Sequence, residues 1–276
     1  MSSLKVIKNR IKSVENTRKI SKTMRLVSAA KYAKAERELL TSRPFGNSPQ
    51  YFIETVGLTL DPKPDSRLVL AVTGDRGLCG AIHSGVARAV HMSIESLKVD
   101  TNPLTKLICI GEKSRVILSR VYAKKILWIA SEIGKKPSTF IDASRIAQMI
   151  LKSMADYQFS QIQVYYNKLI SPSVYTVSTL NLFDRSAIAS APKIALYDAL
   201  DDNIVDCWIE FSIAAMIYLV LKEGSVAEQA ARMTAMENAS KNASEMIKQL
   251  QLEYNRTRQA VITGELIEII SGASAI

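Results

Sequence analysis

The chain has 276 residues, of which 47% are hydrophobic and 22% are charged. This balance excludes a wholly disordered chain and is ordinary for a soluble globular protein. The longest uncharged apolar run, from Phe211 to Leu221, is too short to cross a bilayer as a helix, and no apolar signal sequence opens the chain. We therefore expect a soluble, non-secreted protein.

The net charge of +10 is distributed unevenly along the chain. Residues 1–43 contain twelve Lys and Arg against three Glu, a local charge of +9. Residues 193–276 contain seven Lys and Arg against twelve Asp and Glu, a local charge of −5, which leaves +6 for the middle. A basic head and an acidic tail predict two ends that pair with each other or with charged partners.

The first segment has the pattern of one long helix. Apolar residues recur at spacings of three and four from Leu4 to Val27, and no Gly or Pro occurs before Pro44. We expect about forty residues of helix that end at Arg43-Pro44, with a length of roughly 60 Å at 1.5 Å per residue.

The middle of the chain alternates between strand and helix patterns. Continuous apolar runs predict strands at residues 68–72, 107–110, 126–129, 162–166 and 174–180. Helical patterns lie between them, at 81–97, before 126 and at 139–157. Such alternation predicts a mostly parallel sheet with helices on both faces. Only Asn167 to Ser173 separate the last two strands, so we expect these to form an antiparallel hairpin at one edge.

The last segment, from about Asn203, predicts a second helix of some seventy residues, on the order of 100 Å long. Its interior breakers are Gly224 and Gly264, each of which costs about 1 kcal/mol relative to Ala. Helices of this length need a buried face, so we expect the two ends to form an antiparallel coiled coil. The remaining apolar surface would then face a partner: Met24, Val27, Ile262, Leu266, Ile269 and Ile270.

The expected fold class is therefore α/β, with a long antiparallel coiled coil of the terminal helices and a Rossmann-like domain. We divide the chain into an N-terminal coiled-coil helix (1–58), an α/β base domain (59–200) and a C-terminal coiled-coil helix (201–276).

Motifs for catalysis or cofactor binding are incomplete. The turn Gly74–Gly80 does not match the GxG motif of dinucleotide sites, because its second glycine position is occupied by Arg76. The segment Gly111–Ser114 lacks the adjacent Gly-Lys pair of a phosphate loop. We expect a tight strand-to-helix turn with positive φ instead. His83 and His91 are read as structural histidines. The odd set of three cysteines has no CxxC spacing, which favours free thiols over a zinc site. We expect no catalytic set, cofactor or metal.

Three stretches of the chain carry a family resemblance. They are IKSVENTRKISKTMRLVSAAKYAKAERE in the head, GDRGLCGAIHS at 74–84, and EQAARMTAMENASKNASEMI with YNRTRQAVITGELIEIISGASAI in the tail. Together they closely resemble the gamma subunits of F-type ATP synthases, and their sequences are more similar to the mitochondrial members than to the bacterial ones. This resemblance implies a non-catalytic central-stalk rotor that transmits rotation of the membrane c ring to the catalytic alpha and beta subunits.

The resemblance also implies partners and a location. Three alpha and three beta subunits would surround the coiled coil, and the base would contact the delta and epsilon subunits and the c ring. The location would be the matrix side of the mitochondrial inner membrane, peripheral through the complex. Mitochondrial members are made with a cleaved, Arg-rich presequence, and this chain does not begin with one. Nucleic acid is not an expected partner.

Site residues carry over by position from the family's motifs. Met24 lies in the segment that resembles the contact with the moving lever of beta. Tyr197 and Asp201 fall where the family's foot approaches the c ring. The tail residues that resemble those hydrogen-bonded to a beta loop are Arg258, Gln259, Thr263 and Glu265. Gly264 departs from the family, whose members usually carry a long polar residue there.

Two other functions remain open from the sequence. One is a basic, non-catalytic coiled-coil scaffold or nucleic-acid-binding protein, which would use the positive head. The head, however, has only one aromatic residue, Tyr32, among its basic residues, and the acidic tail would repel nucleic acid. A nucleotide-dependent enzyme would use the α/β domain, although its glycine motifs fail.

Overall fold

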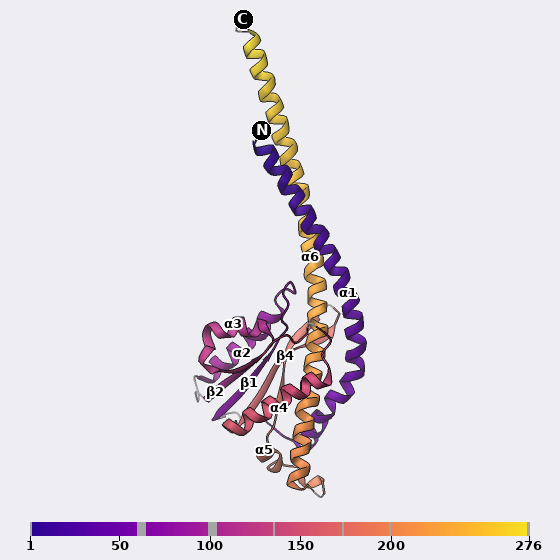
Figure 1. The fold of residues 1–276 in the computed structure, drawn as a ribbon, viewed down its shortest axis with the longest axis vertical. Helices are drawn as coiled ribbons and strands as arrows, with labels where there is room; N and C mark the ends of the chain where they lie inside the picture. Colours follow the sequence, from indigo (N-terminus) through magenta and orange to yellow (C-terminus); the bar gives the residue numbers. More distant parts are fainter. Residues whose placement is uncertain are drawn as a thin grey trace. The chain divides into compact units, whose positions relative to one another are not determined.

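The computed structural model describes residues 2–59, 65–98, 104–134, 136–172, 174–198 and 200–274 (Figure 1). The helices are α1 (Ser2–Val56), α2 (Ile82–Lys98), α3 (Glu112–Tyr122), α4 (Phe140–Tyr157), α5 (Arg185–Ala189) and α6 (Asp202–Ser274). The strands are β1 (Ser66–Val72), β2 (Leu104–Ile110), β3 (Ile126–Ala130), β4 (Gln161–Ser171) and β5 (Val174–Leu182). Two short 3₁₀ turns are η1 (Ala123–Lys125) and η2 (Ile194–Leu196). The chain forms two compact units, Ala30–Ala231 and the pair Met1–Ala29 with Arg232–Ile276.

The larger unit contains a five-stranded sheet in the order β3-β2-β1-β4-β5. β1 pairs in parallel with β2 and β4, β2 pairs in parallel with β3, and β5 pairs antiparallel with β4 at the edge. The mostly parallel sheet and its antiparallel edge hairpin are confirmed. One detail is wrong: β4 continues to Ser171, so most of the segment Asn167–Ser173 is strand and not connection.

The central strands β1 and β2 are buried on both faces of the sheet. Alternate residues of each strand point to opposite sides. Leu68 and Leu70 of β1 pack on one side with α4 and α6, while Val69 and Ala71 pack on the other with α2 and α3 (Figure 1). Burying side chains of this size contributes about 1.5–3 kcal/mol each. The continuous apolar run that predicted β1 therefore reflects burial on two faces.

Helix α1 differs from the expectation that it stops at Pro44. It continues through Pro44 and Pro49 to Val56. A proline inside a helix costs about 3 kcal/mol, but the surrounding turns carry buried residues, including Leu39 at 1% exposure and Val56 at 0%. Burial within the larger unit outweighs the local preference, which sequence pattern alone does not reveal.

Helix α6 follows the expected boundaries. Within the described chain it is the helix long and apolar enough to cross a membrane by composition, and just over half of its most apolar stretch is buried in the protein. Core helices of soluble proteins have the same property. Ile213, Ile217 and Val220 of this stretch lie in the core beside the sheet.

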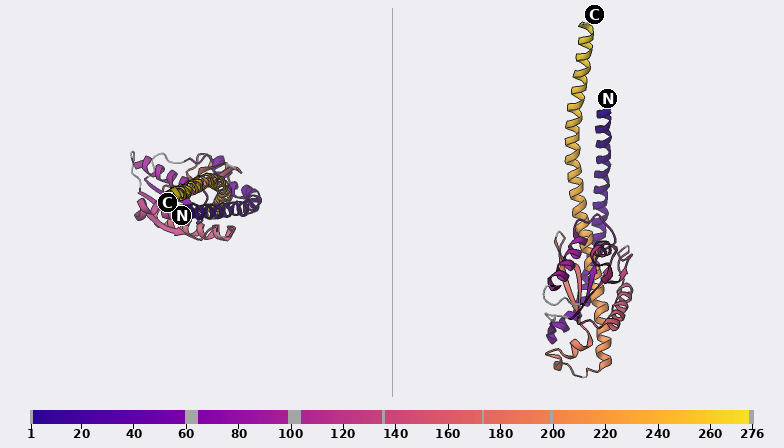
Figure 2. Two further views of the ribbon diagram at one scale, coloured as in Figure 1. Left: turned by 90° about the horizontal axis from the view of Figure 1, so that it is seen from above. Right: turned by 90° about the vertical axis from the view of Figure 1, so that its left-hand side faces the viewer.

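The smaller unit is a pair of antiparallel helical segments, the start of α1 and the end of α6, which run side by side in both views (Figures 1 and 2). Its buried residues are Ile7, Ser21, Ser28, Arg232, Met236, Ala243 and Leu250, and three of them, Ser21, Ser28 and Ala243, are small. Lys241 bonds to Glu237 at 3.1 Å and lowers the pKa of that carboxyl, with a further contribution from Arg25 of α1. The predicted antiparallel coiled coil is confirmed. The tail segment in this unit carries five Lys and Arg against five Asp and Glu, so the acidic residues of the tail lie mostly in the larger unit.

The close approach of α1 to α6 in the larger unit gives a stability prediction. A Cβ at Gly46 would lie 2.4 Å from Leu219 Cβ, whereas a Cβ at Gly224 would meet nothing within 4 Å. We expect Gly46→Val to lower the free energy of unfolding by about 1–3 kcal/mol through overpacking. Gly224→Ala, the control, should raise it by about 0.5–1 kcal/mol. Urea titration of the full chain measures both, and an unchanged midpoint for Gly46→Val would contradict the packing.

Candidate functional site

A buried carboxylate joins three elements of the larger unit. Glu223 of α6 is 2% exposed. Its Oε1 accepts from Nε of Arg43 on α1 at 2.8 Å, and its Oε2 accepts from the backbone N–H of Leu169 on β4 at 3.0 Å. Arg43 Nη2 donates to the Leu169 carbonyl at 3.1 Å, which closes the ring. A single carboxylate thus ties α1, α6 and the sheet together.

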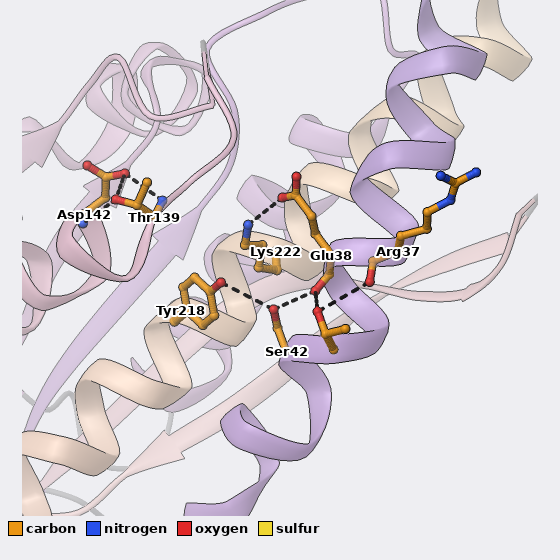
Figure 3. Close-up of polar contacts among 8 residues, drawn as sticks. Arg37, Glu38, Ser42, Thr139, Asp142, Tyr218 and Lys222 are labelled. Carbon is orange, nitrogen blue, oxygen red and sulfur yellow. Dashed lines mark hydrogen bonds and ion pairs between the residues drawn. The ribbon is translucent and has the colours of Figure 1, made fainter.

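A second ion pair lies five residues earlier on α1. Lys222 Nζ donates to Glu38 Oε2 at 2.7 Å and stands 5.3 Å from the centre of the Tyr218 ring (Figure 3). The hydroxyl of Ser42 donates to the Glu38 carbonyl at 2.7 Å and lies 3.4 Å from the Tyr218 hydroxyl. We call the two pairs, Glu38–Lys222 and Arg43–Glu223, the polar junction.

The Arg43–Glu223 pair affects the pKa values of two groups at the junction. The hydrogen bond from Arg43 to Glu223 raises the pKa of Arg43, so that guanidinium stays protonated. Burial, followed by the nearby Glu223 charge, raises the pKa of Tyr166 to about 12. Removing Arg43 would leave the buried Glu223 carboxylate without its cation, which costs about 3–5 kcal/mol. The junction is therefore a strong constraint on the two helices.

The glycine turn after β1 has a structural role. His83 is buried, its Nδ1 accepts from the Gly74 N–H at 3.4 Å, and its Nε2 donates to the Arg76 carbonyl at 3.0 Å. This is the structural histidine that the sequence predicted. Positive φ falls on Leu78 and Gly80, whereas Gly74 lies close to α6: a Cβ there would lie 2.0 Å from Glu228 Oε2, so the Glu228 carboxylate would have to move. His91 bonds to the Tyr122 hydroxyl at 2.6 Å.

The start of α3 does not offer a phosphate site. The N–H of Glu112 donates to Asp75 Oδ1 at 2.7 Å, that of Lys113 to the Gly74 carbonyl at 3.3 Å, and that of Ser114 to Thr73 Oγ1 at 2.9 Å. Free N–H groups at a helix start are what bind anions. Here the turn after β1 occupies them. Across the described ranges, no cluster of three or more His, Cys, Asp or Glu is placed to hold a metal.

The tail residues implied by the resemblance are exposed on α6. Helical spacing places Arg258 and Glu265 in one row, with Gln259 and Thr263 in the adjacent row. Exposed apolar residues occupy the same two rows: Ile262, Leu266, Ile269 and Ile270. Polar and apolar groups thus share one solvent-facing surface. Met24 on α1 is half-buried.

Tyr197 and Asp201, which the resemblance places near the c ring, make contacts within this chain. The Tyr197 ring stands 5.1 Å from that of Phe52, and the Asp201 carbonyl accepts from two N–H groups at the start of α6. Arg185, which sequence analysis missed, binds both Asp202 and Asp206 beside them.

Sequence analysis also missed the polar junction. Its signal is the pair Lys222-Glu223 directly after an eleven-residue apolar run, Phe211 to Leu221. A charge at a position where the helix is buried requires a partner. The identity of the partners, Glu38 and Arg43, depends on the helix register and could not be read from spacing.

Comparison with known proteins covers the whole chain. The ATP synthase family profile matches residues 3–276. The mitochondrial ATP synthase subunit gamma of Drosophila melanogaster is 49% identical over 100% of this chain and 91% of its own length. The mitochondrial ATP synthase F(1) complex subunit gamma of Rattus norvegicus is 42% identical over 100% of both. The chain belongs to the ATP synthase gamma-subunit family.

Solved structures agree with the fold of this gamma subunit. A chain in the central stalk and c ring structure of the Tetrahymena thermophila mitochondrial ATP synthase is 27% identical, with a TM-score of 0.67 over 80% of this chain and 99% of that one. A chain of the Euglena gracilis mitochondrial ATP synthase, at 21% identity, has a TM-score of 0.82 over 99% of this chain and 94% of that one, and supports the fold alone.

Loss of the buried carboxylate should destabilise the chain. We expect Glu223→Gln to lower the free energy of unfolding by about 1.5–3 kcal/mol, because the carboxylate that accepts from Arg43 and from the Leu169 N–H is replaced by a neutral amide. Glu210→Gln, at an exposed position of the same helix, should change it by less than about 0.5 kcal/mol. Urea unfolding followed by circular dichroism measures both variants. Equal stabilities would show that the junction contributes nothing.

The unusual Gly264 gives a second prediction. A Cβ there would meet nothing within 4 Å, so Gly264→Ala adds no clash. We expect the variant to slow hydrogen exchange of the surrounding α6 amides about fivefold, since Ala favours helix over Gly by about 1 kcal/mol. Exchange measured by mass spectrometry tests this, and faster exchange in the variant would contradict it.

Proposed function

We propose that this gamma subunit is the central-stalk rotor of a mitochondrial, proton-translocating ATP synthase. It is non-catalytic and transmits rotation of the membrane c ring to the catalytic alpha and beta subunits. The observation that carries the proposal is the match to mitochondrial gamma subunits over the full length of the chain. The complex places it peripherally on the matrix side of the inner membrane, with the delta and epsilon subunits at its base.

A rotor must pass torque from its base into its shaft. In this proposal residues 59–200 form the base, and residues 1–58 and 201–276 form the shaft. The polar junction attaches α1 and α6 to each other, and Glu223 also attaches both to β4. Two ion pairs, each with one buried partner, oppose sliding of α1 against α6, because sliding would separate opposite charges in a setting of reduced dielectric constant.

The shaft can do work only if its contact energy differs between the conformations of a partner. We assign that contact to Met24 and to the tail residues. Arg258 suits a carboxylate, which its planar guanidinium can bind with two hydrogen bonds. Gln259, Thr263 and Glu265 extend the polar surface beside it. Tyr197 and Asp201 are assigned to the c ring side.

A nucleic-acid function has less support. The one aromatic residue of the basic head, Tyr32, is 8% exposed, and its hydroxyl donates to Glu36 at 2.7 Å. Its ring therefore offers no face on which a base could stack.

A charge at Met24 should uncouple the complex. We expect Met24→Lys to assemble with alpha and beta subunits but to lower the protons pumped per ATP hydrolysed at least about twofold, because the lysine adds a charge to an apolar, half-buried contact. Met24→Leu, the control, keeps apolar volume and should retain coupling. Pumping and hydrolysis are measured together in reconstituted vesicles. Normal coupling in Met24→Lys would remove the residue from the contact.

The proposal as a whole is tested by co-purification with matching alpha and beta subunits. We expect a complex of three alpha, three beta and one of this chain that hydrolyses ATP only when all three are present. A chain that stays alone, and leaves hydrolysis unchanged, would refute the rotor and favour a coiled-coil scaffold.

A further inference from the structure

Strand β5 lies at one edge of the sheet, and its outer side carries a row of unpaired backbone groups. The pair Leu169–Tyr175 fixes which groups these are, because the N–H and C=O of Leu169 bond to Glu223 and Arg43 and so point away from β5. In an antiparallel ladder, such a non-hydrogen-bonded pair recurs at every second residue. The N–H and C=O groups of four β5 residues therefore point outward from the sheet: Tyr175, Val177, Thr179 and Asn181.

This edge lacks the usual protection against pairing with another chain. Strand β5 has nine residues, Val174–Leu182, and contains no proline and no charged residue. Proteins commonly shield a free edge with prolines, with charges or by keeping the strand short. The opposite edge strand, β3, has only five residues. Among the residues that the structure describes, no group bonds to the outward N–H and C=O groups of β5.

A groove of about 460 Å³ lies between this edge and α1. From β5 it is lined by the consecutive residues Val177, Ser178 and Thr179. Their side chains alternate between the two faces of the sheet, so the groove meets the strand at its edge. Asn47 and Gln50 of α1 form part of the facing wall. A strand edge beside a helix can hold an extended peptide, which bonds to the strand through its main chain.

The lining of the groove includes two groups of β4 that have no partner. Tyr166 is 4% exposed, and within the described chain its hydroxyl makes no hydrogen bond. Burial raises the pKa of Tyr166 to about 12, so the hydroxyl remains a donor, and a buried tyrosine hydroxyl usually has an acceptor. Lys168 is exposed, and no carboxylate of the described residues pairs with it. With Arg43 and Glu223, the lining carries two cations and one carboxylate, which favours an acidic occupant.

We propose that a partner polypeptide adds an extended segment to β5 as a sixth strand of the sheet, with an acidic side chain directed at Lys168 and the Tyr166 hydroxyl. Main-chain hydrogen bonds to Val177 and Thr179 supply affinity, and the groove selects the side chains. A second copy of this chain fits less well, because it would bring an uncharged β5 and another Lys168 to the same groove. The segment belongs to another subunit of the complex, so the inference rests on the proposed rotor function and adds a contact to it.

The test is hydrogen exchange resolved to single amides, in the free chain and in the complex purified with its partner subunits. In the free chain we expect slow exchange for the inward amides of Thr176 and Ser178, which bond to β4, and fast exchange for the outward amides of Val177, Thr179 and Asn181. In the complex the outward amides should slow at least about tenfold, because each acquires a main-chain acceptor.

A proline at the edge tests whether strand pairing causes the protection. Thr179→Pro removes an outward N–H at an exposed position and leaves the bonds to β4 in place, and edge strands tolerate proline there. We expect the protection of Val177 and Asn181 in the complex to fall at least about fivefold. The matched control, Thr179→Ala, keeps the N–H and should keep the protection.

A charge reversal tests the same contact without changing the backbone, and it decides the matter if the inward amides show that the proline disturbs the hairpin. Lys168→Glu should lower the protection of the outward amides, because it repels an acidic segment. Lys152→Glu, at an exposed position of α4 outside the groove, is the control and should leave it unchanged.

Two results would overturn the proposal. The outward amides of an assembled complex could exchange as fast as in the free chain. Their protection could also survive both Thr179→Pro and Lys168→Glu, which would indicate covering without strand pairing. A chain that forms no complex would instead refute the rotor assignment, and this inference with it, so the two failures are distinguishable.

Discussion

The buried carboxylate of Glu223 is the constraint on which the larger unit depends. It is 2% exposed and has two partners, the Arg43 guanidinium and the Leu169 N–H, on two other elements. A buried charge tolerates little displacement of its partners, because each ångström of separation in a low-dielectric interior is costly. The register of α1 against α6 and of both against β4 follows from it. A rotor needs that fixed register more than it needs maximal stability.

The α/β domain has the architecture of a nucleotide-binding fold, but its own side chains and backbone occupy the places near the strand ends where such folds bind a ligand. The N–H groups at the start of α3 donate to Asp75, Gly74 and Thr73. The carboxylate of Glu228 on α6 lies so close to Gly74 that it would have to move to admit a Cβ there. The domain therefore holds its own helix where related architectures hold a ligand, which suits a base that is attached to a shaft.

Sequence pattern predicted most of the fold, because burial on two sheet faces and helical periodicity both leave strong local signals. β1, α4 and α6 begin and end within a few residues of their expected limits. The predicted end of the first helix at Pro44 was wrong, because tertiary burial of α1 outweighs the cost of a proline. The polar junction could not be predicted, since pairing Arg43 with Glu223 depends on packing between residues 180 positions apart. The tail residues came from the family resemblance, and their exposure on α6 is consistent with a partner surface.

Rotation of the base relative to a fixed alpha–beta ring tests the central claim most directly. Cys207 is the exposed cysteine among the three, so a biotin maleimide can attach a bead near the start of α6. With the ring immobilised, the account predicts stepwise, unidirectional rotation of the bead that requires ATP and stops when ATP is exhausted. A bead that stays stationary while the same complexes hydrolyse ATP would contradict the assignment of this chain as the rotor.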